Sequence, residues 1–161
     1  MLKLLVENGA EITSETISKE ENVNNFEILS YLIDNGGDPN SENGLPIRQV
    51  IKGVQTKDGK VYHTDCLELL LKSGGDPRSR NMMGARMVLE CGNNDIIKMI
   101  YDFLNETYSI SEELLTTSFD WLVTAEKGKV AVDEVIELVI DLLKGYGRTE
   151  LVDWVIKNYK K

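Results

Sequence analysis

One eight-residue phrase occurs twice in the chain, and it constrains the fold more than any other feature. Residues 36–43 read Gly-Gly-Asp-Pro-Asn-Ser-Glu-Asn, and residues 74–81 read Gly-Gly-Asp-Pro-Arg-Ser-Arg-Asn. The two copies lie 38 residues apart, and six of the eight positions are identical without a gap. An internal match of this kind indicates that the chain repeats one supersecondary unit.

Short apolar segments precede both copies and recur elsewhere in the same register. They cover residues 2–9, 29–36 and 67–74, with a fourth copy at 97–104 that lacks the glycine and a looser one at 152–159. Each segment is apolar on most faces, which is typical of a short helix buried between neighbours. The sequence therefore predicts a series of buried helices.

The residues after these segments predict how each helix ends. A glycine suits the left-handed position that follows a helix, and Asp-Pro then turns the chain. The next helix is expected over residues 46–51 after the first turn and over 84–89 after the second. Arg48 and Arg86 therefore occupy equivalent places in two copies.

This order of phrases resembles the ankyrin repeat, whose pattern runs Gly-x-Thr-Pro-Leu-His-x-Ala-Ala, then Gly-His, then an apolar helix ending in Gly-Ala-Asp. Residues 44–48 resemble the start, 92–97 the Gly-His link, and 9–11, 36–38 and 74–76 the stop. The resemblance covers roughly residues 1–105. The family's histidine is arginine here, at Arg48 and Arg86, and its Ala-Ala pair is replaced by bulkier residues, which implies altered helix packing.

The resemblance implies an all-α, ankyrin-type solenoid of about four to five helix pairs. Residues 106–161 are expected to continue it as divergent repeats or to cap it. Helices are predicted there at 111–115, at 132–143 with a stop near Gly145, and at 149–156, and an exposed turn at 126–129.

The 38-residue spacing exceeds the ankyrin period of about 33, and residues 55–64 hold the extra length. Asp58-Gly59 is a tight-turn signal, so this insertion is predicted to be a protruding loop or a small hairpin. Insertions in solenoids often serve binding, and the alternative is a tolerated surface insertion. The candidate residues of this insertion loop are Lys57, Lys60, Tyr62 and His63.

The N-terminal part departs from the repeat. Residues 18–25 are too polar for a well-formed first helix, and residues 2–9 are of second-helix type, with no first helix before them. The apolar side chains of residues 2–6 would then be exposed on one side. An upstream extension, folding back of residues 11–25 and cover by a partner all explain this, and we favour a monomer over a dimer.

Charge and composition exclude several classes of function. The net charge is −9, divided as −7 over residues 1–45, +2 over 46–105 and −4 over 106–161. An acidic chain is repelled by phosphates, so nucleic acid is an unlikely partner. The sequence lacks a run of 18 apolar residues for a membrane span. Two cysteines, Cys66 and Cys91, favour a reducing cytoplasmic setting over a disulfide framework.

Catalytic and metal-binding patterns are weak. A nucleophilic site would have to use His63, the single histidine, with Cys66 as the nearest nucleophile. Neither a zinc-ligand spacing nor a phosphate loop is recognisable. We therefore expect no enzyme activity and no cofactor.

Without a catalytic or metal-binding pattern, the remaining candidate for function is a protein-binding surface. In ankyrin-like stacks the turns and first helices form a face that binds other proteins, and arginine is favoured at such interfaces. The alternative function is an acidic inhibitor or effector that mimics nucleic acid, with the carboxylates of 7–42 and 106–141 on one surface. The predicted partner-binding residues are Asn40, Ser41, Glu42, Asn43, Arg48, Arg78, Ser79, Arg80, Asn81 and Arg86.

Overall fold

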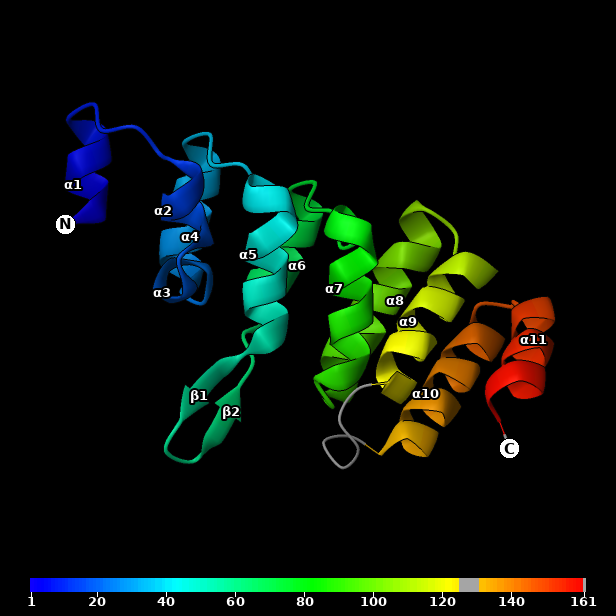
Figure 1. Ribbon diagram of the computed structural model, residues 1–161. Coiled ribbons are helices and arrows are strands. Elements are labelled where there is room, and N and C mark those ends of the chain that lie inside the picture. Colours follow the sequence, from blue (N-terminus) through cyan, green and yellow to red (C-terminus); the bar gives the residue numbers. More distant parts are fainter. Residues whose placement is uncertain (125–130, 161) are drawn as a thin grey trace. The chain divides into compact units, whose positions relative to one another are not determined.

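The computed structural model describes residues 1–124 and 131–160 (Figure 1). The turn predicted at 126–129 lies outside these residues. The chain divides into two compact units, residues 1–81 and 82–161. Both are helical, which confirms the all-α prediction apart from one small hairpin. Within the described ranges, none of the helices has the length and apolarity needed to cross a membrane.

The first unit holds the N-terminal helices and the hairpin. Its elements are α1 (Leu2–Glu7), α2 (Ser14–Ser18), α3 (Glu20–Val23), α4 (Phe26–Asp34), α5 (Ser41–Lys52), β1 (Val54–Thr56), β2 (Gly59–Val61) and α6 (Thr64–Lys72). Helix α2 packs on α5, α4 packs on α6, and α5 packs on α6. Leucines that align between the copies, Leu29 and Leu32 in α4 with Leu67 and Leu70 in α6, are fully buried.

The second unit begins within α7 (Ser79–Glu90). It continues with α8 (Asn94–Thr107), α9 (Glu112–Thr124), α10 (Val132–Gly145) and α11 (Thr149–Tyr159). Helix α10 packs on α8 and on α11, and α11 also packs on α9. The buried Tyr101 of α8 and Phe119 of α9 are the largest side chains of its core.

The Gly-Gly pairs end the repeated helices as the sequence predicts. Gly36 has a φ of +92°, its N–H donates to the carbonyl of Ile33, and the N–H of Gly37 donates to the carbonyl of Leu32 at 2.8 Å. These two bonds form a Schellman motif, which satisfies carbonyls that the helix itself leaves free. The same pair of bonds follows α1 at Gly9, α6 at Gly74 and α10 at Gly147. Helix α10 ends at Gly145, in agreement with the predicted stop near that residue, and Gly147 is the left-handed glycine that follows.

The second glycine of each pair is required by close packing. A Cβ atom on Gly37 would lie 2.7 Å from the carbonyl oxygen of Leu32 and 3.0 Å from Cδ1 of Ile17. A Cβ atom on Gly75 would lie 2.8 Å from both Leu70 O and Ile47 Cδ1. The first glycine thus supplies the left-handed backbone, and the second leaves room for a side chain of an earlier helix, Ile17 of α2 or Ile47 of α5.

A left-handed turn after each Asp-Pro was not predicted. Residues 42, 43 and 44 have φ values of 53°, 55° and 79°, and the equivalent residues 80, 81 and 82 have values of 54°, 55° and 58°. Left-handed backbone costs an L-residue about 1–2 kcal/mol. The repetition at the same 38-residue offset shows that the two copies share this backbone as well as their sequence.

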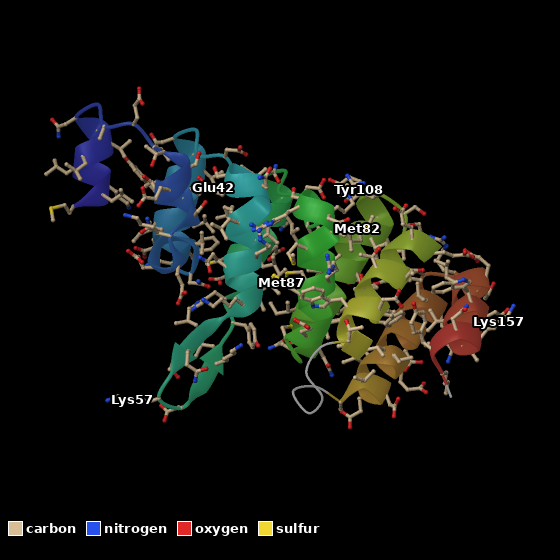
Figure 2. All side chains as sticks on the ribbon, viewed as in Figure 1. Glu42, Lys57, Met82, Met87, Tyr108 and Lys157 are labelled. Atoms are coloured by element: carbon tan, nitrogen blue, oxygen red, sulfur yellow. The ribbon has the colours of Figure 1, made fainter. Side chains whose placement is uncertain are left out.

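The insertion forms a two-stranded antiparallel hairpin, with Val54 paired to Val61 and Thr56 paired to Gly59. The turn is Lys57-Asp58, one residue earlier than the Asp58-Gly59 signal indicated. The hydroxyl of Thr56 explains the shift, because it donates to Gly59 O and accepts from the Asp58 N–H. Lys57 lies at the outer end of the hairpin (Figure 2).

The polar N-terminal stretch folds into two short helices, α2 and α3, which are separated at Lys19 by extended backbone. The sequence predicts that residues 18–25 are too polar for a well-formed first helix. The structure has two short helices in this region instead of one continuous helix. Helix α1 buries none of its residues, and Leu4 and Leu5 are 63% and 53% exposed. The predicted exposure of this apolar segment is confirmed for these two leucines.

We expect Gly37→Ala and Gly75→Ala each to lower the free energy of unfolding by about 1–3 kcal/mol, because the added methyl group overpacks the helix stop. Urea denaturation of the purified variants measures this loss. Gly145→Ala is the matched control, since a Cβ atom there meets nothing within 4 Å and φ is not left-handed. A loss at Gly37 no larger than at Gly145 would contradict the packing argument.

Candidate functional site

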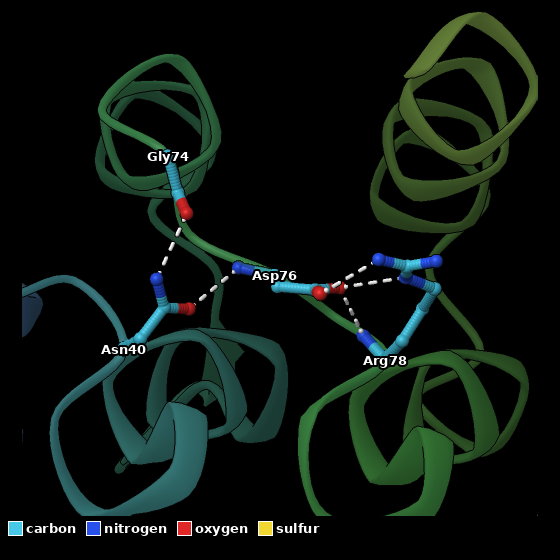
Figure 3. A network of polar contacts seen from close by, with 4 residues as sticks. All are labelled: Asn40, Gly74, Asp76 and Arg78. Carbon is cyan, nitrogen blue, oxygen red and sulfur yellow. Dashed lines mark hydrogen bonds and ion pairs between the residues drawn. The ribbon is translucent and has the colours of Figure 1, made fainter. Parts of the chain in front are cut away.

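Asn40 ties the first Gly-Gly turn to the second within the first unit. Its side-chain amide donates to Gly74 O at 2.9 Å, and its side-chain oxygen accepts from the Asp76 N–H at 2.8 Å (Figure 3). Its own N–H donates to the Asp38 carboxylate at 2.8 Å, as the N–H of Arg78 does to Asp76. Asn40, predicted as a partner-binding residue, is thus part of the framework between two turns.

Arg78 is the equivalent residue in the second turn. Its side chain contacts Asp76 of its own turn. Its Nε and Nη2 atoms each lie 3.0 Å from a carboxylate oxygen of Asp76. Partial burial by itself would raise the pKa of Asp76, but the hydrogen bonds and charge of Arg78 outweigh it, and the pKa lies below its ordinary value. The guanidinium of Arg78 is therefore already engaged with a carboxylate.

Ser41 and Arg48 are buried, and both support the left-handed turn. The Ser41 hydroxyl donates to Asp38 O at 2.7 Å. The Arg48 guanidinium donates to the carbonyls of Glu42 and Asn43, which left-handed backbone removes from the helix ladder. Burial, with a smaller effect of nearby Arg80, lowers the pKa of Arg48. With each side chain only 6% exposed, these two predicted residues have structural contacts and little surface to offer a partner.

The outward-facing part of the predicted surface is the left-handed turns. Glu42, Asn43, Arg80 and Asn81 are all exposed, whereas Ser79 is half-buried. Glu42 also lines a small surface hollow together with Glu15, Ser18, Lys19 and Leu45. Sequence reasoning named these four exposed residues but did not find the hollow, because α2 was not predicted.

Arg86 belongs to the second unit and has a different environment. Its guanidinium carbon lies 4.1 Å from the centre of the Trp121 ring. No signal in the sequence relates residues 86 and 121. The equivalence of Arg48 and Arg86 in the repeat therefore does not extend to their contacts.

The insertion residues divide into two kinds. Lys57 and Lys60 are exposed on the hairpin. The half-buried Tyr62 packs its ring against Gly53, where a Cβ atom would meet ring carbons at 2.9 and 3.0 Å. His63 is half-buried as the N-cap residue of α6. The lysines can face a partner, and Tyr62 closes the base of the hairpin.

Cys66 is fully buried in α6, so its thiol is not placed as an exposed nucleophile beside His63. Burial, followed by the charge and hydrogen bond of Asp65, raises the pKa of the Cys66 thiol to about 12. Cys91 is half-buried, and neither cysteine is in a disulfide. Among residues 1–124 and 131–160, no three metal-ligating side chains gather.

Comparison of the chain with protein-family models, curated proteins and solved structures finds no match.

We expect Asn40→Ala to lower the free energy of unfolding by about 1–3 kcal/mol, because it leaves Gly74 O and the Asp76 N–H without their partner. Urea denaturation measures the loss. Asn8→Ala is the control, since Asn8 makes one exposed hydrogen bond within its own helix, to Leu4, and should change stability little. Equal losses in the two variants would show that the link between the turns contributes nothing.

We expect the native protein at pH 8 to have one fast thiol and one slow thiol towards a chromogenic disulfide reagent. Cys66 is the slow one, because its buried thiol stays protonated. Its folded-state pKa lies above the value of about 8.5 in an unfolded chain, so its contribution to stability is complete below that pH and is lost as the pH rises towards 12. A Cys91→Ser variant that reacts as fast folded as in urea would contradict this assignment.

Proposed function

We propose that this chain is a non-catalytic, ankyrin-type helical-repeat protein that binds another protein through its left-handed turns. The observation that carries the proposal is the pair of exposed turns, residues 42–43 and 80–81, which recur with the same backbone at the repeat spacing. An intracellular setting is part of the proposal and is supported by the cysteine count, since two cysteines cannot form a disulfide framework.

The support for binding is preorganisation. Strained backbone persists only where surrounding contacts hold it, and such strain is concentrated at functional sites. Arg48 and Ser41 hold the first turn from inside, and Asn40 ties its base to the next turn. A rigid turn loses little conformational entropy when a partner binds, which raises affinity.

The support for specificity is the side chain at the exposed position. The repeated phrase differs at only two of eight positions, and one of these places Glu42 in the first copy and Arg80 in the second. Both side chains are exposed on equivalent left-handed residues. One frame thus presents opposite charges, which suits a partner segment that carries both signs.

The support for an ankyrin-type stack is the packing within each unit. In the first unit, α2 packs on α5 and α4 on α6, so members of one helix pair contact the corresponding members of the next. In the second unit, α8 packs on α10 and α9 on α11 in the same alternate order. The acidic inhibitor stays an untested prediction, since its two acidic segments belong to different units.

The test begins with affinity capture of a partner by the wild-type chain and continues with the purified partner in calorimetry. Arg80→Glu is expected to weaken binding at least about tenfold, which corresponds to about 1.4 kcal/mol. Arg80→Glu combined with Arg86→Glu should weaken it further. Lys72→Glu is the matched control, because it makes a similar charge change at an exposed residue of α6 whose ion pair is with Glu68.

Urea denaturation must show that the variants remain folded. If Arg80→Glu and Lys72→Glu bind the partner as the wild type does, the left-handed turns are not the binding surface.

A further inference from the structure

Arg86 and Trp121 form a stacked pair in the second unit, with α7 supplying the arginine and α9 the tryptophan. The guanidinium carbon is 4.1 Å from the ring centre, so the guanidinium lies close against the aromatic ring. Both side chains are half-buried. Stacking on an aromatic ring restricts the guanidinium to one orientation and removes water from one of its faces.

Within the described residues, no hydrogen bond uses the donors of this pair. Arg86 Nε and Trp121 Nε1 are both enclosed and have no acceptor in the described part of the chain. The two terminal nitrogens of Arg86 are not among the enclosed atoms, and no hydrogen bond or ion pair joins them to a residue within 1–124 or 131–160.

Three other arginines are engaged in contacts, and Arg80 is exposed on its turn. Arg48 donates to main-chain carbonyls, and Arg78 to Asp76. Arg148 pairs with Glu150 at 2.7 Å and donates to Ser109 at 3.0 Å. Arg86 combines a fixed orientation with free terminal donors, and this combination matches the planar, two-oxygen geometry of a carboxylate.

We infer that the Arg86–Trp121 pair is a binding site for a carboxylate group of a peptide segment in the protein partner. The inference rests on the proposed function for the identity of the ligand as part of a protein. The guanidinium edge binds the two carboxylate oxygens, and the Trp121 ring holds the guanidinium from behind.

Net charge favours a peptide carboxylate over a nucleic acid. Residues 82–161 contain fourteen acidic and nine basic residues, which gives −5. This field repels each phosphate of a polyanion, whereas a peptide segment brings one or two carboxylates and can add basic residues beside them. The ligand is therefore a glutamate, an aspartate or a C-terminal carboxylate in a segment that is not itself strongly acidic.

The experiment follows the indole N–H of Trp121 by NMR in the full chain, with Trp154→Phe used to assign the two indole signals. The probe is a blocked eight-residue Gly/Ser peptide with two glutamates, and the control probe has glutamine at both positions. A third peptide has no glutamate but a free C-terminus, which distinguishes the two sources of carboxylate. We expect a saturable shift with a carboxylate peptide and none with the glutamine peptide.

Arg86→Lys keeps the charge but loses the planar fork, and it should weaken peptide binding about tenfold. Arg148→Gln removes a positive charge from the same unit and should leave binding unchanged. The absence of a saturable shift in the wild type, or an equal shift with the glutamine peptide, overturns the inference whatever the variants do. A saturable shift with a single-stranded oligonucleotide instead of the peptides also overturns it.

The two proposals fail separately. If the peptides do not bind but Arg80→Glu still loses the partner, only the carboxylate site is wrong. If the peptides bind and Arg80→Glu keeps the partner, the carboxylate site stands and the left-handed turns are not the binding surface.

Discussion

The hydrogen bond from the N–H of Gly37 to the carbonyl of Leu32, repeated from Gly75 to Leu70, is the interaction on which the repeat depends. It closes a helix one residue after a left-handed glycine and sends the chain towards the next helix pair. A backbone that returns so tightly leaves no room for a Cβ atom on the second glycine. The helix stop and the close packing of Ile17 and Ile47, from earlier helices, against the second glycine therefore have one cause.

The tight glycine helix stop also positions the polar residues of the turns. Because each turn is rigid, the Asn40 side chain can reach both Gly74 and Asp76, and the Asp38 and Asp76 carboxylates hold the same position in their own turns. Left-handed residues 42–44 then direct two main-chain carbonyls towards Arg48. The buried side chains of the turn make contacts within the fold, and only its exposed side chains can contact a partner.

The arginines illustrate how far a repeat pattern predicts contacts. Arg48 and Arg86 are equivalent in sequence, yet one is buried against carbonyls and the other stacks on Trp121. Arg78 is equivalent to Asn40, yet it turns back to its own aspartate. Equivalent positions share a backbone because the backbone is set by local residues. Their side-chain partners differ: Arg48 and Arg78 bond within their own turns, whereas Arg86 contacts a tryptophan of another helix.

The sequence by itself determined the repeated helices, their glycine stops, the place of the insertion and the exposure of the first apolar segment, because each depends on residues close together in the chain. It also singled out the exposed residues Glu42 and Arg80 as candidates for binding. Only the tertiary structure decided which candidates are free. Ser41 and Arg48 are buried by packing across helices, Asn40 bonds to a turn more than thirty residues away, and Arg86 meets a tryptophan of another helix. The contacts of Asn40 and Arg86 join residues that are distant in the chain, so no local sequence pattern reveals them.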